Sequence, residues 1–138
     1  MAENIKLEVV TPEKYVVSED AQIVMAPGSL GEFGVLSGHT PFLTSLKVGR
    51  LHYKDTSGQE RELFVSGGFA EALPDRVTVL AESAERRSEI DIDRAKASLE
   101  RAQKRLAEEK AENMNFERAR AAMYRALERI KLAESSRT

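Results

Sequence analysis

The sequence predicts an α+β fold in two parts, a β-rich domain over residues 1–84 and an antiparallel two-helix hairpin over residues 85–138. Three observations lead to this prediction. All eight glycines stand at or before Gly68 and all four prolines at or before Pro74, so the strong turn signals belong to the first part. Apolar and polar residues alternate in that part. Beyond Ser88 the apolar residues recur instead at steps of three and four, which is the period of a helix.

Short alternating segments define the first part. Examples are Ile5–Val9, Gln22–Met25 and Arg76–Val79, and turn sequences such as Asp55–Gly58 and Pro74–Arg76 stand between strands. Several short strands at this spacing are typical of an antiparallel sandwich or barrel. The sequence pattern alone leaves the choice between these two architectures open.

Two apolar stripes define the helices of the second part. Ser88 and Asp91 resemble a capping box before the first stripe, and Glu112–Asn115 suits a turn before the second. One continuous helix through residue 113 is the alternative. Five of the eleven seam positions are alanine, which buries little apolar area, so we expect a marginal hairpin that opens easily. The stripes are Ile92, Ala95, Leu99, Ala102 and Leu106, then Phe116, Ala119, Met123, Ala126, Ile130 and Ala133.

The composition excludes several classes of function. The chain has no cysteine, which rules out disulfides and thiolate metal sites, and its two histidines, His39 and His52, cannot build a metal cage alone. No window reaches the ~20 apolar residues of a membrane-spanning helix, so we expect no direct membrane insertion. Basic residues of the second part are interleaved with acidic ones, which indicates solvated helix faces and no nucleic-acid partner.

Three loops could carry chemistry, but a structural role suits each better. Gly28–Gly34 is rich in glycine yet lacks the Lys-Ser/Thr ending of a phosphate loop. Ser66–Gly68 lacks the spacing of a nucleophile elbow, so we interpret it as a bulge or a tight crossing between strands. His39 lies in a tight corner where a ring nitrogen can satisfy a backbone group; contact with a partner and catalysis are the alternatives.

One charged cluster flanks the helical seam. Each of its members stands one position before a seam residue, and the members are Asp91, Arg94, Arg101, Arg125 and Arg129. If the hairpin closes, guanidinium groups of both helices approach each other and repel unless acidic residues or a bound anion lie between them. Salt bridges and an anion site both remain open on this argument.

Three segments carry a resemblance to a known family: Gly28–Leu43, Phe64–Phe69 and Val77–Glu82. Together they resemble the epsilon subunits of bacterial F-type ATP synthases, and the similarity spans the chain. The resemblance implies a ten-stranded antiparallel β-sandwich followed by the helical hairpin. It implies a non-catalytic rotor subunit that requires no cofactor, whose sandwich binds the gamma subunit and the c-subunit ring. The helices would inhibit ATP hydrolysis at the alpha and beta subunits. The subunit would lie at the cytoplasmic face of the bacterial inner membrane.

The resemblance also implies site residues. Glu32 and His39 would contact the c ring, although Ser37 stands where members often have proline. Ile90–Ala95 matches a motif with which some members bind ATP, a regulatory ligand that would favour the closed hairpin. The implied ATP site comprises Glu85, Asp91, Arg94, Arg101, Arg125 and Arg129. A stand-alone ATP-sensing protein is the alternative function, and an enzyme that uses His39 is a remote third.

Overall fold

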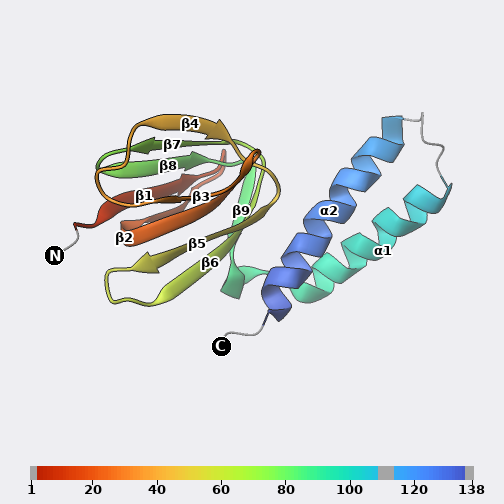
Figure 1. Cartoon of the computed structure of the whole chain (residues 1–138). Coiled ribbons are helices and arrows are strands. Elements are labelled where there is room, and N and C mark those ends of the chain that lie inside the picture. The colour runs from red at the N-terminus through yellow and green to blue at the C-terminus, as the bar shows by residue number, and fades with distance from the viewer. Residues whose placement is uncertain (1–2, 109–113, 136–138) are drawn as a thin grey trace. The chain divides into compact units, whose positions relative to one another are not determined.

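The computed structural model describes residues 3–108 and 114–135. The chain divides into two compact units, Met1–Arg86 and Arg87–Thr138 (Figure 1). The first unit contains the strands and the second the helices. The boundary placed at residues 84/85 from sequence falls inside the last strand, which runs to Arg86.

Nine strands make up the β unit within the described residues. Their bounds are β1 Ile5–Val10, β2 Tyr15–Gly28, β3 Gly31–Val35, β4 Phe42–Ser45, β5 Gly49–Asp55, β6 Glu60–Ser66, β7 Phe69–Leu73, β8 Arg76–Leu80 and β9 Ser83–Arg86. They are hydrogen-bonded in the order β4-β7-β8-β1-β2-β5-β6-β9, and β3 pairs with β2. This confirms the predicted fold class, although the described sheet has nine strands where ten were expected.

The sheet is mixed rather than wholly antiparallel. β1 pairs with β8 in parallel, with Leu7 opposite Val77, whereas the other strand pairings of the described residues are antiparallel. The strand β2 has 14 residues and serves both sides of the sandwich. It pairs with β1 up to Ala21 and with β5 from Ala21 onward, with an irregularity between Ala21 and Ile23. Such irregularities bend strands and allow one strand to serve two layers.

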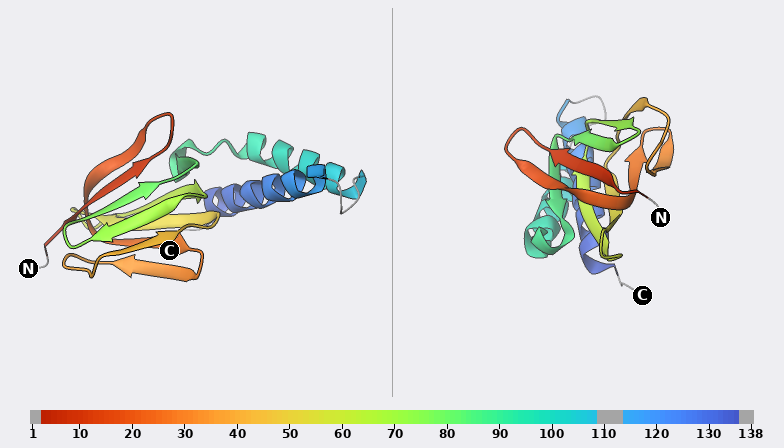
Figure 2. Two further views of the ribbon diagram at one scale, coloured as in Figure 1. Left: turned by 90° about the horizontal axis from the view of Figure 1, so that it is seen from above. Right: turned by 90° about the vertical axis from the view of Figure 1, so that its left-hand side faces the viewer.

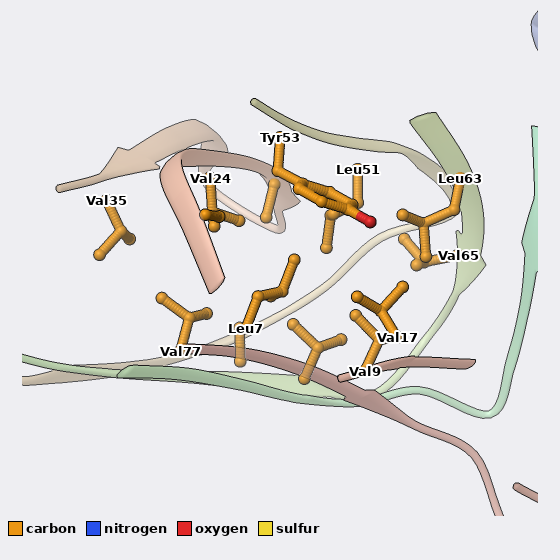
Figure 3. Packing of buried hydrophobic residues seen from close by; sticks show 14 of the residues in the cluster. Leu7, Val9, Val17, Val24, Val35, Leu51, Tyr53, Leu63, Val65 and Val77 are labelled. Carbon is orange, nitrogen blue, oxygen red and sulfur yellow. The ribbon is translucent and has the colours of Figure 1, made fainter. Parts of the chain in front are cut away.

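The core lies between these layers because alternate residues of each strand point inward. Leu7 and Val77 come from one layer, and Leu51 and Leu63 from the other; all four are fully buried (Figure 3). The period-2 pattern seen in the sequence therefore corresponds to the buried face of the sheet.

A polar group within this core joins three strands. The Tyr53 ring of β5 is buried, and its hydroxyl donates to Glu19 of β2 and accepts from Arg86 Nη1 of β9 at 3.2 Å. Burial, together with the hydrogen bond to Glu19, raises the pKa of Tyr53 to about 12. The hydroxyl is thus a buried polar group with both a donor and an acceptor partner, as burial requires.

The β5–β6 turn is organised by one carboxylate. Asp55 Oδ1 accepts from the Ser57 hydroxyl at 2.6 Å and from the Gln59 amide at 2.9 Å, and Arg61 Nε donates to Oδ2 at 3.1 Å. The Ser57 hydrogen bond foremost, with those of Gln59 and Arg61, lowers the pKa of Asp55 to about 2. The charged form of Asp55 therefore holds this turn.

Glycines at the other turns confirm their structural interpretation. Gly28 and Gly31 face each other in the β2–β3 hairpin, where Ser29 and Leu30 form the turn. Gly68 lies between β6 and β7 with a φ of 97°, and a Cβ there would overlap the Leu80 carbonyl oxygen. Ser66–Gly68 is therefore a tight crossing between strands, one of the two alternatives that the sequence allowed.

Two helices, α1 Ile92–Glu108 and α2 Met114–Glu134, follow a short 3₁₀ turn, η1 Arg87–Glu89. They pack side by side (Figures 1 and 2). Lys96 Nζ near the start of α1 lies 3.8 Å from a Glu134 carboxylate oxygen at the end of α2, so the pair is antiparallel. This excludes one continuous helix. Residues Glu112 and Asn113 of the predicted turn lie outside the described residues, whereas Asn115 is already helical.

The predicted seam is confirmed, with alanine at its most buried positions. Ala95, Ala102, Ala119 and Ala126 are 1–4% exposed, and the larger stripe residues are half-buried. The predicted capping box is wrong, because Ser88 lies in η1 and the helix begins only at Ile92. Asp91 is the cap instead: its Oδ1 accepts the Arg94 amide at 3.0 Å, as an N-cap residue does.

Candidate functional site

A hollow of about 420 Å³ opens between the two helices. It is lined by Ser98, Arg101, Ala102 and Arg105 of α1 and by Arg118, Ala119, Ala121, Ala122 and Arg125 of α2. We call the hollow with its four arginines, Arg101, Arg105, Arg118 and Arg125, the arginine groove. The small alanine side chains leave the space that the arginines surround.

The groove contains two of the residues that the sequence predicted. Arg101 and Arg125 come from different helices, as predicted for a closed hairpin. Arg101 Nη2 donates to the Ser98 hydroxyl at 3.1 Å, which fixes its guanidinium on the α1 side. Arg125 is half-buried, whereas Arg101 is exposed.

The other predicted residues do not line the groove. Asp91 and Arg94 are exposed at the start of α1, where a backbone cap joins them rather than a side-chain ion pair. Arg129 is half-buried near the end of α2, about one helical turn beyond Arg125. Glu85 belongs to β9 of the other unit, opposite Phe64 in the register with β6. The structure thus brings together only Arg101 and Arg125 of the predicted ATP site in this groove.

Two groove residues, Arg105 and Arg118, were missed although the sequence contained their signal. Arg105 stands one position before Leu106 and Arg118 one before Ala119, the same relation to the seam that selected Arg101 and Arg125. Applied along the whole seam, this rule finds all four groove arginines.

The charge of the groove is uncompensated by its own lining. None of its nine lining residues is acidic. Arg101 and Arg105 are separated by four positions on α1, an arrangement of like charges that costs roughly 0.2–0.5 kcal/mol of helix stability. A site of this kind attracts anions, because guanidinium groups donate paired hydrogen bonds to carboxylates and phosphates.

Glu32 and His39, the predicted c-ring contacts, are held by separate local interactions. Glu32 is exposed on β3, and its carboxylate lies 3.6 Å from His52 Nε2. His39 Nδ1 donates to the Thr40 carbonyl oxygen at 2.6 Å, and its ring packs on Phe42 with centroids 5.2 Å apart. The sequence-based prediction that a His39 ring nitrogen satisfies a backbone group is confirmed.

An apolar strip lies on the outer face of strands β4, β7 and β8. It consists of Leu43, Phe69 and Leu80, which are 68%, 56% and 56% exposed. Phe69 and Leu80 are direct partners in the β7–β8 register, whereas Leu43 lies opposite Glu71 of β7, two positions along the strand from Phe69. Outward positions of a sheet are usually polar when they face only water, so a strip of three large apolar side chains indicates a contact surface.

Residues 3–108 and 114–135 contain neither a membrane-spanning helix nor a cluster of metal ligands. No helix in these ranges is long and apolar enough to cross a membrane. The same residues contain no group of three or more histidine, aspartate or glutamate side chains that could hold a metal ion.

Both units match models of protein families. Residues 4–87 match the beta-sandwich domain of the ATP synthase delta/epsilon chain, and residues 88–134 match the long alpha-helix domain of the same chain. A relative called ATP synthase epsilon chain from Desulforapulum autotrophicum is 63% identical over 98% of this chain and 99% of its own length. Another of that name from Syntrophobacter fumaroxidans is 57% identical over 99% of this chain and all of its own length.

Solved structures show the same fold at low identity. A chain in the mitochondrial ATP synthase of Euglena gracilis, in a structure of OSCP, F1 and c-ring, has a TM-score of 0.77 and 22% identity, over 90% of this chain and 78% of that one. A chain of the central stalk and c-ring of the Tetrahymena thermophila enzyme has a TM-score of 0.61 and 14% identity, over 96% and 98%. At such identities the likeness is one of fold.

Proposed function

Because this chain belongs to the ATP synthase delta/epsilon chain family, we propose that it is a non-catalytic subunit of the central stalk of an F-type ATP synthase. The observation that carries the proposal is that both units match, and that epsilon chains align with it from end to end. In this role the subunit couples ion flow through the c ring to ATP synthesis on the catalytic head. The chemistry takes place on other subunits.

The β unit supplies the anchor. Leu43, Phe69 and Leu80 form the surface that docks on the gamma subunit, because burying these exposed side chains removes apolar area from water at ~25 cal/mol per Å². Glu32 and His39 contact the c ring, where polar side chains suit the rim of an interface. The subunit is thereby attached peripherally to the cytoplasmic face of the bacterial inner membrane through its partners.

The hairpin supplies regulation. The most buried positions of its seam are alanines, which contribute little apolar area per residue, so separating the two helices costs little. The separated helices inhibit ATP hydrolysis by reaching the alpha and beta subunits of the catalytic head, whereas the packed hairpin leaves the head free. Two arrangements of similar free energy are what a switch requires.

ATP acts on this switch as a regulatory ligand. It binds the packed hairpin more tightly than the separated helices, because only packing brings arginines of α1 and α2 together, as at Arg101 and Arg125. The stabilisation equals RT ln(1 + [ATP]/Kd) if the separated helices do not bind. The proposed contacts are Glu85, Asp91, Arg94, Arg101, Arg125 and Arg129.

Co-purification with a gamma subunit tests the central proposal. The chain is co-expressed with gamma from the same source, and the two are expected to elute as one complex in gel filtration. Leu43→Glu should weaken the complex at least tenfold, since it places a charge in the docked strip. Leu36→Glu is the matched control, because Leu36 is also an exposed leucine, at 55% against 68% for Leu43, and lies outside the strip.

Separate elution of the wild-type chains would refute the stalk role. Equal weakening by both variants would refute the docking surface. Binding of ATP by a chain that forms no complex with gamma would favour the alternative, a stand-alone ATP-sensing protein.

A further inference from the structure

The outer face of strands β3, β2, β5 and β6 carries a row of side chains centred on His52. The register sets this row, because residues directly opposite one another on neighbouring strands point to the same face. His52 of β5 lies opposite Met25 of β2 on one side and Glu62 of β6 on the other. Pro27, two positions from Met25 along β2, lies opposite Glu32 of β3. Glu32 and His52 therefore share this face, with β2 between them.

Each ring nitrogen of His52 faces a carboxylate. Nε2 lies 3.6 Å from Glu32 Oε2, and Nδ1 lies 3.8 Å from Glu60 Oε1. Neighbouring strands are ~4.8 Å apart, so the backbones of Glu32 and His52 are ~10 Å apart and their side chains meet above β2. The His52 side chain is 16% exposed, whereas those of Glu32 and Glu60 are 52% and 51% exposed. The imidazole is thus the sheltered centre of the group, and the two carboxylates approach it from more exposed positions.

The other charged side chains around the ring come from β5 and β6. Glu62 lies opposite His52, but its Oε2 accepts a hydrogen bond from Arg50 Nη1 at 2.8 Å. Lys54 lies opposite Glu60 and two positions from His52 on the same face. The nearest positions of β2 on this face are apolar. One carboxylate thus remains for each ring nitrogen.

Protonation decides how many of these carboxylates the ring can serve. A neutral imidazole has one N–H group, whereas the imidazolium has two. In the described part of the chain, His52 Nε2 is buried and has no hydrogen-bond partner, a state that buried polar groups rarely keep. Only the imidazolium can donate to both Glu32 and Glu60 and thereby satisfy both nitrogens. Histidine is the side chain that ordinarily gains this proton between pH 8 and pH 5.

We propose that His52 is a positioning residue for Glu32 and that its hold on Glu32 depends on pH. As an imidazolium, His52 donates to the Glu32 carboxylate and keeps it above β2. A neutral ring shares its one proton between the two nitrogens, so it releases the carboxylate for part of the time, and the carboxylate then extends from β3 toward a partner. The inference rests on the proposed function in that Glu32 contacts the c ring. That contact therefore weakens as the pH falls.

Carbon-detected NMR of the free full-length chain tests the positioning without any partner. The carboxyl carbon of Glu32 is followed from pH 8 to pH 6, an interval in which ordinary glutamates stay ionised while histidine titrates. Its resonance should shift in step with the ring signals of His52, and the shift should disappear in His52→Gln. The matched control is Lys54→Gln, which removes a charge from the same face of the same strand and should keep the shift.

A Glu32 resonance that does not respond to pH in the wild type would overturn the inference, whatever the variants do. A shift that persists in His52→Gln would also overturn it, because the shift would then arise from another group such as His39. Glu60→Ala leaves the single proton of the neutral ring to Glu32 alone. The Glu32 resonance of this variant at pH 8 should therefore lie closer to its position at pH 6, and an unchanged resonance would contradict the sharing of one proton between two carboxylates.

Binding to a detergent-solubilised complex of the gamma subunit with the c ring tests the consequence. The affinity of the wild type and of Lys54→Gln should fall roughly two- to fivefold from pH 8 to pH 6, the range of exposed ion pairs, whereas that of His52→Gln should change less. If the Glu32 resonance follows His52 but neither pH nor Glu32→Gln alters binding, the positioning stands and the proposed c-ring contact of Glu32 fails. If Glu32→Gln weakens binding while the resonance ignores pH, the contact stands and the role of His52 fails.

Discussion

Replacing Gly68 by alanine should destabilise the β unit far more than the same change at Gly58. Both glycines have positive φ, 97° and 86°, a conformation that costs an alanine ~1–2 kcal/mol. Their surroundings differ. An added Cβ at Gly58 meets nothing within 4 Å, whereas at Gly68 it overlaps the Leu80 carbonyl oxygen and lies 2.8 Å from the Leu80 carbonyl carbon.

The difference in the free energy of unfolding between the two variants measures the cost of this overlap. Ordinary carbon contacts are ~3.5–4.0 Å, so the backbone around Gly68 must move by about 1 Å. That movement strains the hydrogen bond from the Leu46 amide to the Gly68 carbonyl, now 2.9 Å, and the start of the β7–β8 ladder. Overpacking costs roughly 1–3 kcal/mol and a hydrogen bond ~1 kcal/mol, so Gly68→Ala should cost about 2–4 kcal/mol more than Gly58→Ala.

Urea unfolding measures this difference. The chain has no tryptophan and three tyrosines, of which Tyr53 is buried in the β unit, so tyrosine fluorescence follows that unit. With a slope of ~1.5 kcal/mol per molar urea, the Gly68→Ala midpoint should lie about 1.3–2.7 M below that of Gly58→Ala. Midpoints within ~0.5 M of each other would refute the reasoning that the crossing at Gly68 is closed to a Cβ.

Three further predictions concern single polar groups. Spectrophotometric titration should resolve one late tyrosine, absent in Tyr53→Phe, because the pKa of Tyr53 is raised to about 12. Its folded-state pKa exceeds the unfolded value of 10.0, so its contribution to stability is complete below about pH 10 and is lost as the pH rises toward 12. For Asp55 the sign is reversed: its pKa is lowered from 3.8 to about 2, so its contribution is complete above about pH 4 and is lost as the pH falls toward 2. Asp55→Asn should therefore flatten the acid limb of a pH–stability profile, and an unchanged limb would contradict the role of this carboxylate. Asp91→Ala should cost the hairpin ~1 kcal/mol in thermal melts followed by circular dichroism, while Asp91→Ser keeps the cap; equal losses would show that capping is not what Asp91 does.

Much of the helical site could be read from periodicity. The seam was predicted residue by residue, because on a helix the spacing alone decides which side chains share a face. The same spacing places Arg105 and Arg118 beside Arg101 and Arg125 in the lining of the groove. The N-cap of α1 was harder to predict, because Ser88 and Asp91 are both good capping residues. Ser88 lies in the 3₁₀ turn Arg87–Glu89, and Asp91 therefore caps the helix.

Less of the sheet than of the hairpin could be predicted from the sequence. Alternation along Ile5–Val10 or Arg76–Leu80 predicted which side chains are buried, but it contains no information about which strand lies beside which. The parallel pairing of β1 with β8 joins segments about 70 residues apart, and the double use of β2 depends on a bend at Ala21. Such pairings follow from long-range packing rather than from local pattern.

By itself the sequence determined the two-part organisation, the buried faces of the strands and the seam of the hairpin, because backbone geometry converts a residue's position into a face. The tertiary structure alone decided which polar groups meet. Glu19, Tyr53 and Arg86 are brought together from three strands. The walls of the arginine groove likewise form only where α1 lies against α2. Contacts between distant segments depend on how elements pack, and packing is a property of the whole fold.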